Sequence, residues 1–113
     1  MTTNSFQADL TFDEIRIKTK VIIETSFSKE IRILMATGQS IKEHQTPFPI
    51  LIHLIDGQIE LGIKGKTQIL NAGNIVGLEG GIPHNLNALE DSVIRLTISK
   101  QDSAIRVENI ANS

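Results

Sequence analysis

The chain has 113 residues, a formal net charge of −2 and no cysteine. This length favours one domain, and the lack of cysteine excludes disulfides, thiolate metal sites and a cysteine nucleophile. Charged residues make up 21% of the chain without a basic run, and aromatic residues only 4%, so we expect neither a nucleic-acid nor a membrane partner.

The first half of the chain begins with an arm and continues with strand-like alternation. Residues 1–13 look like an N-terminal arm whose apolar residues, among them Phe6 and Phe12, pack on something, such as a second subunit. Alternation with period two over 14–23 predicts a half-buried strand. Its expected inner face holds Ile15, Ile17, Thr19, Val21 and Ile23. A second strand follows, with Ile31 and Ile33 on one face.

The second half of the chain repeats this pattern between glycine-marked turns. Asp56-Gly57 lies between two apolar runs and predicts a β-hairpin. The segments 58–63 and 92–99 alternate strictly, and further turns are expected at Lys64-Gly65, at 71–73 and at Gly80-Gly81. Residues 109–113 look like a tail. Short strands with regular turns predict an all-β sandwich or barrel, with one domain over 1–113 and a core at about 30–100.

Three histidines, His44, His53 and His84, are the side chains with ordinary metal-ligand and near-neutral acid–base chemistry. All three lie in "GQSIKEHQTPFPILIHLIDG", from Gly38, and "GNIVGLEGGIPHNLNA", from Gly73. The order and spacing of these segments resemble the two motifs of the cupin superfamily. Gly38, His44 and Gly57 match the first motif, and Gly73, Gly81 and His84 match the second.

The resemblance implies a double-stranded β-helix, a small jelly-roll barrel with a pocket inside. It also implies a metal site of three histidines and a glutamate, from which this chain departs. The second histidine of the first motif is Thr46 and the glutamate is Ile50. In the second motif, Glu79 replaces a proline and Ala88 replaces an asparagine.

By strand parity, residues 44, 46, 50, 52 and 54 share one face if no bulge intervenes. Together with the second motif, this predicts a largely apolar ligand pocket lined by His44, Thr46, Ile50, Ile52, Leu54 and His84. His53 has the opposite parity, so we expect it on the outer face, at an edge or in a subunit interface. Gly81 is expected to adopt a positive φ.

Two functional interpretations remain open. One is a small-molecule-binding cupin whose two histidines fix the polar end of the ligand. The other is a metal-dependent cupin enzyme, of the dioxygenase, isomerase or decarboxylase type. It would use His44 and His84 as ligands to a divalent metal such as Zn, Fe, Mn or Ni. The binder is favoured because the carboxylate and the third histidine are missing.

Two further expectations concern assembly and location. Small cupins often form dimers, so we expect a homodimer, with residues 17–23, the arm and His53 as candidate contact surfaces. The N-terminus lacks the charged and apolar regions of a secretory signal. The longest apolar stretch is too short to cross a bilayer. A cytoplasmic protein is therefore expected.

Overall fold

The computed structural model describes residues 1–100, and all nine elements within them are strands. These are β1 (Lys18–Glu24), β2 (Ser28–Met35), β3 (Ser40–His44), β4 (Ile50–Asp56), β5 (Gln58–Ile63), β6 (Lys66–Asn71), β7 (Ile75–Leu78), β8 (His84–Ala88) and β9 (Ser92–Ser99). Among these residues, no helix is long and apolar enough to cross a membrane. The predicted tail at 109–113 lies outside the described residues.

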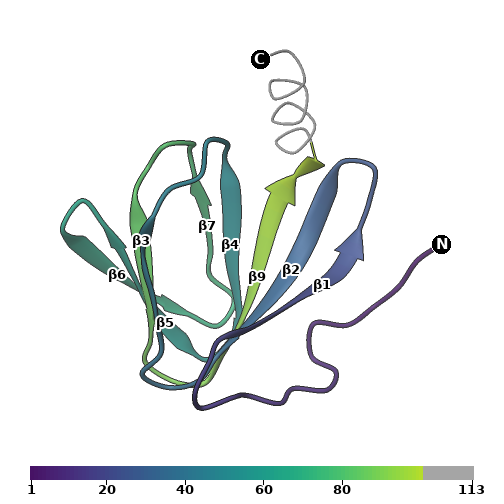
Figure 1. Cartoon of the computed structure of the whole chain (residues 1–113), viewed down its shortest axis with the longest axis horizontal. Helices are drawn as coiled ribbons and strands as arrows, with labels where there is room; N and C mark the ends of the chain where they lie inside the picture. The colour runs from purple at the N-terminus through teal and green to yellow at the C-terminus, as the bar shows by residue number, and fades with distance from the viewer. Residues whose placement is uncertain (101–113) are drawn as a thin grey trace.

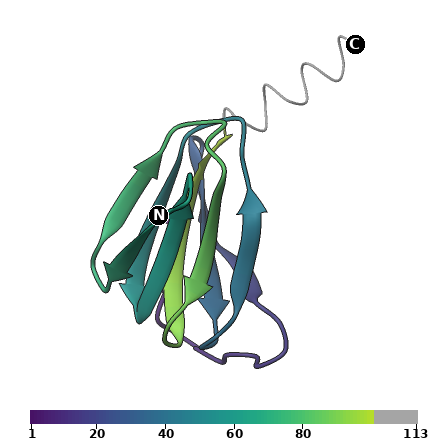
Figure 2. The same ribbon diagram turned by 90° about the vertical axis from the view of Figure 1, so that its left-hand side faces the viewer.

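The strands form two antiparallel sheets, with the orders β1-β2-β9-β4-β7 and β3-β8-β5-β6. Figures 1 and 2 show the two sheets facing one another across the interior of a barrel. Both sheets supply the core, which includes Leu54 and Ile94 from the first and Ile59 and Leu61 from the second. The fold is therefore the all-β double-stranded β-helix that the sequence predicts.

The alternation of β5 and β9 predicts their inner faces correctly. Ile59 and Ile94 are fully buried, at 0% exposure, and Leu61 is 2% exposed. In β5, Glu60 alternates with these apolar residues and is only half-buried. Period-two alternation works here because each of these strands pairs on both sides and neither carries an extra residue; the register shift between β4 and β9 lies on β4.

The predicted inner face of the first strand is wrong in two respects. The strand starts at Lys18, which leaves Ile15 92% exposed in the preceding segment. A register shift between Val21 and Ile23 also interrupts the pairing with β2. The extra residue of this bulge changes the parity. Ile22 is this extra residue and is buried at 6% exposure, whereas Val21, which precedes the shift, is 47% exposed.

Asp56-Gly57 does not form the predicted hairpin. The strands on either side of it, β4 and β5, belong to different sheets and do not pair with each other. The turn instead carries the chain from one sheet to the other, at a point where Gly57 packs tightly on Asp91 and Ser92. By contrast, Lys64-Gly65 does make a two-residue hairpin, between β5 and β6, and both of its residues have positive φ.

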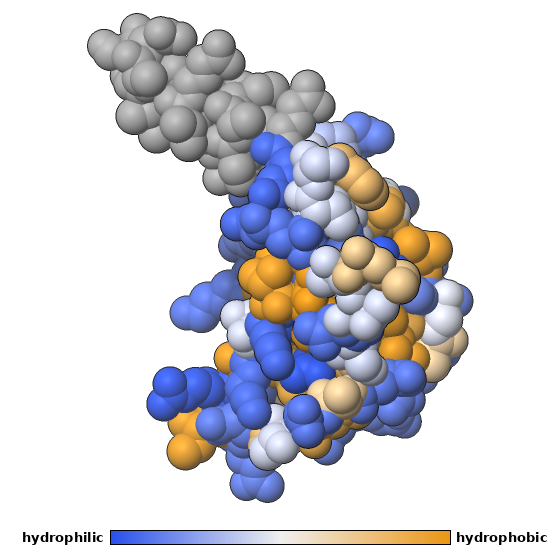
Figure 3. Space-filling model, turned by 90° about the vertical axis from the view of Figure 1, so that its right-hand side faces the viewer, coloured by the Kyte–Doolittle hydropathy of each residue, from blue (hydrophilic) through white to orange (hydrophobic). Residues whose placement is uncertain are grey.

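The N-terminal arm packs on its own barrel. Arg32 of β2 donates from Nη1 to the Ala8 carbonyl oxygen at 2.7 Å, and Asn4 donates from Nδ2 to the Ile22 carbonyl oxygen at 2.8 Å. The Arg95 guanidinium lies over the Phe6 ring, with Cζ 5.7 Å from the ring centroid. Figure 3 views the molecule from the β1 side, where hydrophilic residues surround separate hydrophobic patches. A contact between the arm and a second subunit stays a prediction.

Candidate functional site

A cavity of about 90 Å³ lies between the two sheets. Both motif histidines line it, and aliphatic side chains form most of its wall. The full lining is Ile33, Ile41, His44, Thr46, Ile50, Ile52, His84, Leu86, Ile94, Leu96 and Ile98. The cavity is therefore polar at one end and hydrocarbon elsewhere.

His44 and His84 meet because β3 ends at His44 and β8 begins at His84. The two residues are direct cross-strand partners in the four-stranded sheet. Their ring centroids lie 4.3 Å apart and the ring planes are inclined by 56°. His84 is buried at 3% exposure, whereas His44 is exposed, so the pair connects the interior of the cavity with its open end.

The same local contact holds each imidazole. His44 Nδ1 lies 3.0 Å from the Lys42 carbonyl oxygen, and His84 Nδ1 lies 3.0 Å from the Ile82 carbonyl oxygen. A carbonyl oxygen only accepts, so each Nδ1 must carry the proton that it donates. In the neutral rings this leaves both Nε2 atoms as lone-pair acceptors.

Thr46 completes the polar end of the cavity. Its hydroxyl donates to the Phe48 carbonyl oxygen at 3.0 Å, so the Thr46 proton is already used and Oγ1 retains only acceptor capacity. The polar end thus offers acceptors from two imidazoles and one hydroxyl.

Five of the six predicted pocket residues line the cavity, but they do not share one strand face. Residues 45–49 form the connection from β3 to β4, and these two strands lie in different sheets. His44 and Ile50 therefore line the cavity from opposite sheets, and the prediction that they share one strand face is wrong. Leu54, which we expected in the lining, is fully buried in the core and is not among the lining residues.

Other lining residues were not predicted as site residues, namely Ile33, Ile41, Leu86, Ile94, Leu96 and Ile98. The signal for several of them was present, because alternation alone placed Ile33 and Ile94 on inner faces. His53 lies outside the lining, half-buried on the opposite face of β4 from Ile52, in register with Arg95 and Ile75.

The glycine-rich segment before His84 also contacts the connection that carries Thr46. The Gly81 amide donates to the Thr46 carbonyl oxygen at 2.7 Å. Gly80 lies so close to Pro47 that a Cβ at this position would overlap the Pro47 carbonyl oxygen. These contacts fix the Thr46 backbone relative to the start of β8.

Comparison with known proteins agrees with this geometry. The family model described as "Cupin domain" matches residues 31–99. The chain belongs to the cupin family. A search of curated proteins finds no match.

Solved structures resemble this cupin over most of its length. An RmlC-like cupin from Desulfovibrio desulfuricans has a TM-score of 0.79 at 20% identity, covering 88% of this chain and 96% of the other. A conserved protein of unknown function from Streptococcus pyogenes has a TM-score of 0.75 at 19% identity, covering 88% and 87%. KdgF from Halomonas sp. has a TM-score of 0.71 at 21% identity, covering 88% and 94%. At these identities the likeness establishes the fold alone.

The residues of this cupin do not fit the family's metal site. Within residues 1–100, no group of three or more His, Cys, Asp or Glu side chains could hold a metal ion. Catalytic zinc takes three protein ligands, and the facial iron site takes two histidines and a carboxylate. Here Ile50 presents hydrocarbon at the carboxylate position, and the Thr46 hydroxyl replaces an imidazole. The site keeps only two nitrogen donors.

Proposed function

We propose that this cupin binds a small molecule between its sheets, without assigning it a reaction. The observation that carries the proposal is the arrangement of His44 and His84 at one end of an aliphatic cavity, with each Nδ1 held by a backbone carbonyl. Fixed polar groups at the end of an apolar pocket are typical of small-molecule sites, because they orient a ligand that the apolar wall desolvates.

The polar end determines which ligands fit. It presents two Nε2 atoms and Thr46 Oγ1, all of them acceptors when the imidazoles are neutral. An acceptor-only site favours a ligand with donor groups, such as a hydroxyl or an amine, because a buried acceptor without a partner costs free energy. The oxygen atoms of a ligand carboxylate are also acceptors, so they would face the lone pairs of these site atoms without a proton between them.

The cavity volume limits the apolar part of the ligand. A volume of about 90 Å³ corresponds to the share of roughly three water molecules in liquid water. A short branched alkyl group of a few carbons therefore fills the aliphatic part. Any larger remainder would extend past His44, which is the exposed member of the pair.

Binding is a better proposal than metal-dependent catalysis because the donor set is incomplete. Two imidazoles rarely hold a divalent ion tightly without a further protein ligand. The lining residues Ile50, Ile52 and Ile94 surround the histidines with hydrocarbon and supply no further ligand.

The test uses three probes with the same branched body, namely isobutanol, isobutylamine and isobutyrate. Each is titrated at about pH 8, where an ordinary imidazole is neutral. Methyl and imidazole NMR signals of the untagged protein report binding. We expect saturable shifts with the alcohol and the amine, and binding of isobutyrate at least about tenfold weaker.

Variants distinguish this site from other surfaces. His84→Ala is expected to abolish the shifts, and His53→Ala, the matched control on the outer face, is expected to preserve them. Binding that survives His84→Ala, or that prefers isobutyrate, would contradict the proposal. Stoichiometric Fe, Mn, Ni or Zn in the purified protein, lost in His84→Ala, would favour the metal-dependent enzyme instead.

A further inference from the structure

Three cations lie in register on the outer face of the five-stranded sheet. Lys20 of β1 pairs with Arg32 of β2, and Arg32 pairs with Arg95 of β9. Like charges directly opposite one another on neighbouring strands are destabilising. This cationic row, Lys20, Arg32 and Arg95, therefore needs negative charge close by.

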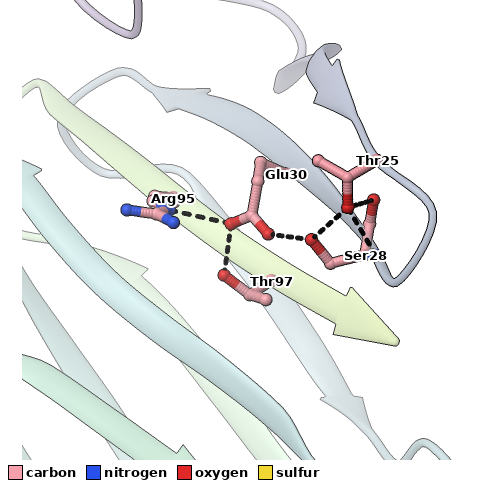
Figure 4. A network of polar contacts seen from close by, with 5 residues as sticks. All are labelled: Thr25, Ser28, Glu30, Arg95 and Thr97. Carbon is pink, nitrogen blue, oxygen red and sulfur yellow. Dashed lines mark hydrogen bonds and ion pairs between the residues drawn. The ribbon is translucent and has the colours of Figure 1, made fainter. Parts of the chain in front are cut away.

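Glu30 supplies that charge to Arg95. Arg95 Nε lies 2.8 Å from Glu30 Oε1, and the hydroxyl groups of Thr97 and Ser28 also donate to the same carboxylate. Figure 4 shows these groups converging on Glu30, with Thr25 behind Ser28. Both Glu30 oxygens are thus engaged, and Arg95 is the cation that they neutralise.

Arg32 has no such partner. It is 6% exposed, and its Nη1 donates to the main-chain carbonyl oxygens of Ala8 and Phe6 at 2.7 and 3.5 Å. Its Nε is buried and has no hydrogen-bond partner within residues 1–100. No carboxylate in the described part of the chain lies within ion-pair distance of this guanidinium. An unpaired buried charge is costly, so this position favours an anion.

A cavity of about 300 Å³ adjoins Arg32 and Asp9 of the arm. It is lined by Asp9, Lys18, Thr19, Lys20, Arg32 and Leu34, which amount to three cationic side chains and one carboxylate. Lys18 also donates from Nζ to the Thr11 carbonyl oxygen at 2.6 Å. Arg32 and Lys18 therefore both line the cavity and donate hydrogen bonds to the main chain of the arm.

We propose that this second cavity binds a small oxyanion, as a free ion or as the phosphate, sulfate or carboxylate group of a ligand. Arg32 is the principal ligand, since a guanidinium matches two oxygens of such a group through paired N–H donors. Lys20 and Lys18 add positive charge from β1. The bound anion neutralises Lys20 and Arg32 and stabilises the arm against the sheet.

The experiment titrates the full chain with inorganic phosphate, with sodium chloride adjusted to keep the ionic strength constant. The Arg Nε–H signals in ¹H–¹⁵N spectra report on Arg32 directly. We expect a saturable shift of the Arg32 signal, absent when chloride alone is varied. Lys20→Gln is expected to weaken phosphate binding about two- to fivefold, whereas the control Lys66→Gln on β6 leaves it unchanged.

Arg32→Met is expected to remove saturable phosphate binding. If this variant does not fold, phosphate binding by Lys20→Gln is compared with that by Lys66→Gln, and this comparison tests the proposal. No saturable shift of Arg32, or equal binding by the two lysine variants, would overturn the proposal. A shift of the Arg32 signal that depends on protein concentration in the absence of phosphate would also overturn the proposal. In that case a carboxylate of a second copy of the chain would be the anion that pairs with Arg32.

Discussion

The Gly81 amide and the Thr46 carbonyl oxygen are joined by a hydrogen bond of 2.7 Å. This bond links the segment that leads into His84 with the segment that follows His44. Gly81 makes it with a φ of 79°, in the left-handed region. The positive φ expected from the sequence is thus confirmed, and the glycine contributes to the placement of both histidines.

Gly81→Val is expected to lower the free energy of unfolding by about 1 kcal/mol or more, because a β-branched residue adopts this φ only with strain. Apart from its two chain neighbours, no atom of the described residues lies within 4 Å of the position where a Cβ would be, so the cost arises from the backbone. Gly81→Asn should recover much of the loss, since asparagine tolerates this region. Urea unfolding measures both variants, and wild-type stability of the valine variant would contradict the assignment.

Gly57 and Gly73 share a φ of 94° but differ in their surroundings. A Cβ at Gly57 would overlap the Asp91 carbonyl oxygen and Ser92, whereas nothing lies within 4 Å of a Cβ at Gly73. Gly57→Ala should therefore destabilise by about 1–3 kcal/mol more than Gly73→Ala. Thermal and urea unfolding of the two variants provide the measurement. Equal losses of stability in the two variants would mean that the turn between β4 and β5 has room for a Cβ at Gly57.

Glu30 is expected to make stability depend on pH. Burial raises its pKa, but hydrogen bonds from Thr97, Arg95 and Ser28 outweigh burial and bring the pKa below its ordinary value of 4.5. The folded state therefore binds this proton less readily than the unfolded state. The stabilisation is complete above about pH 4.5 and is lost as the pH falls through the folded pKa.

Glu30→Gln should cost about 1–2 kcal/mol at pH 7, a figure that allows for solvent screening of Arg95, whose side chain is 41% exposed. The difference from wild type should shrink as the pH is lowered towards 3. Urea unfolding at several pH values tests this, with exposed Glu43→Gln as control. A difference that does not vary with pH would show that the carboxylate charge is not responsible.

Thr46→His should create a metal site, because it adds a third imidazole to a cavity already lined by His44 and His84. Catalytic zinc commonly has three protein ligands. We expect Zn²⁺ affinity at least about tenfold above that of the parent chain, measured by competition with a chromophoric chelator. Gln45→His, at the neighbouring exposed position outside the lining, is the control. Equal affinity of the two variants would argue against the assigned correspondence with the cupin motif.

A homodimer remains our prediction, and the outer face of β4 and β7 is a surface on which to test it. Leu51 and Ile75 are 43% and 59% exposed there, on the face that also carries His53. Light scattering at micromolar concentration should give the dimer mass for wild type and a smaller mass for Leu51→Asp. A monomeric wild-type protein would refute the prediction.

Local sequence patterns predicted where the strands lie better than they predicted which strands pair with one another. Alternation identified the inner faces of β5 and β9, which carry no extra residue. It failed at Ile22 because a bulge adds one residue, and at Asp56-Gly57 because a tight turn joins two sheets here rather than two paired strands. Pairing partners depend on segments far apart in the chain, and a short window contains no information about them.

The candidate site shows the same limit. Motif spacing identified His44 and His84, but the carbonyl contacts that fix their tautomers required coordinates. Alternation placed Glu30 and Arg32 opposite the core face, where charged residues are ordinarily solvated. Both are buried, at 6% exposure, and Arg32 is held by carbonyls of the N-terminal arm more than twenty residues earlier in the chain.

The central position of β9 in the five-stranded sheet has a consequence for biosynthesis. This strand lies between β2 and β4, and its pairing joins Ser28 to Ser99. Among the strands of residues 1–100, a ribosome completes β9 last, so the nascent chain exposes two unpaired strand edges until translation reaches this point. Such edges attract other chains. Release of this cupin from chaperones should therefore follow the emergence of β9.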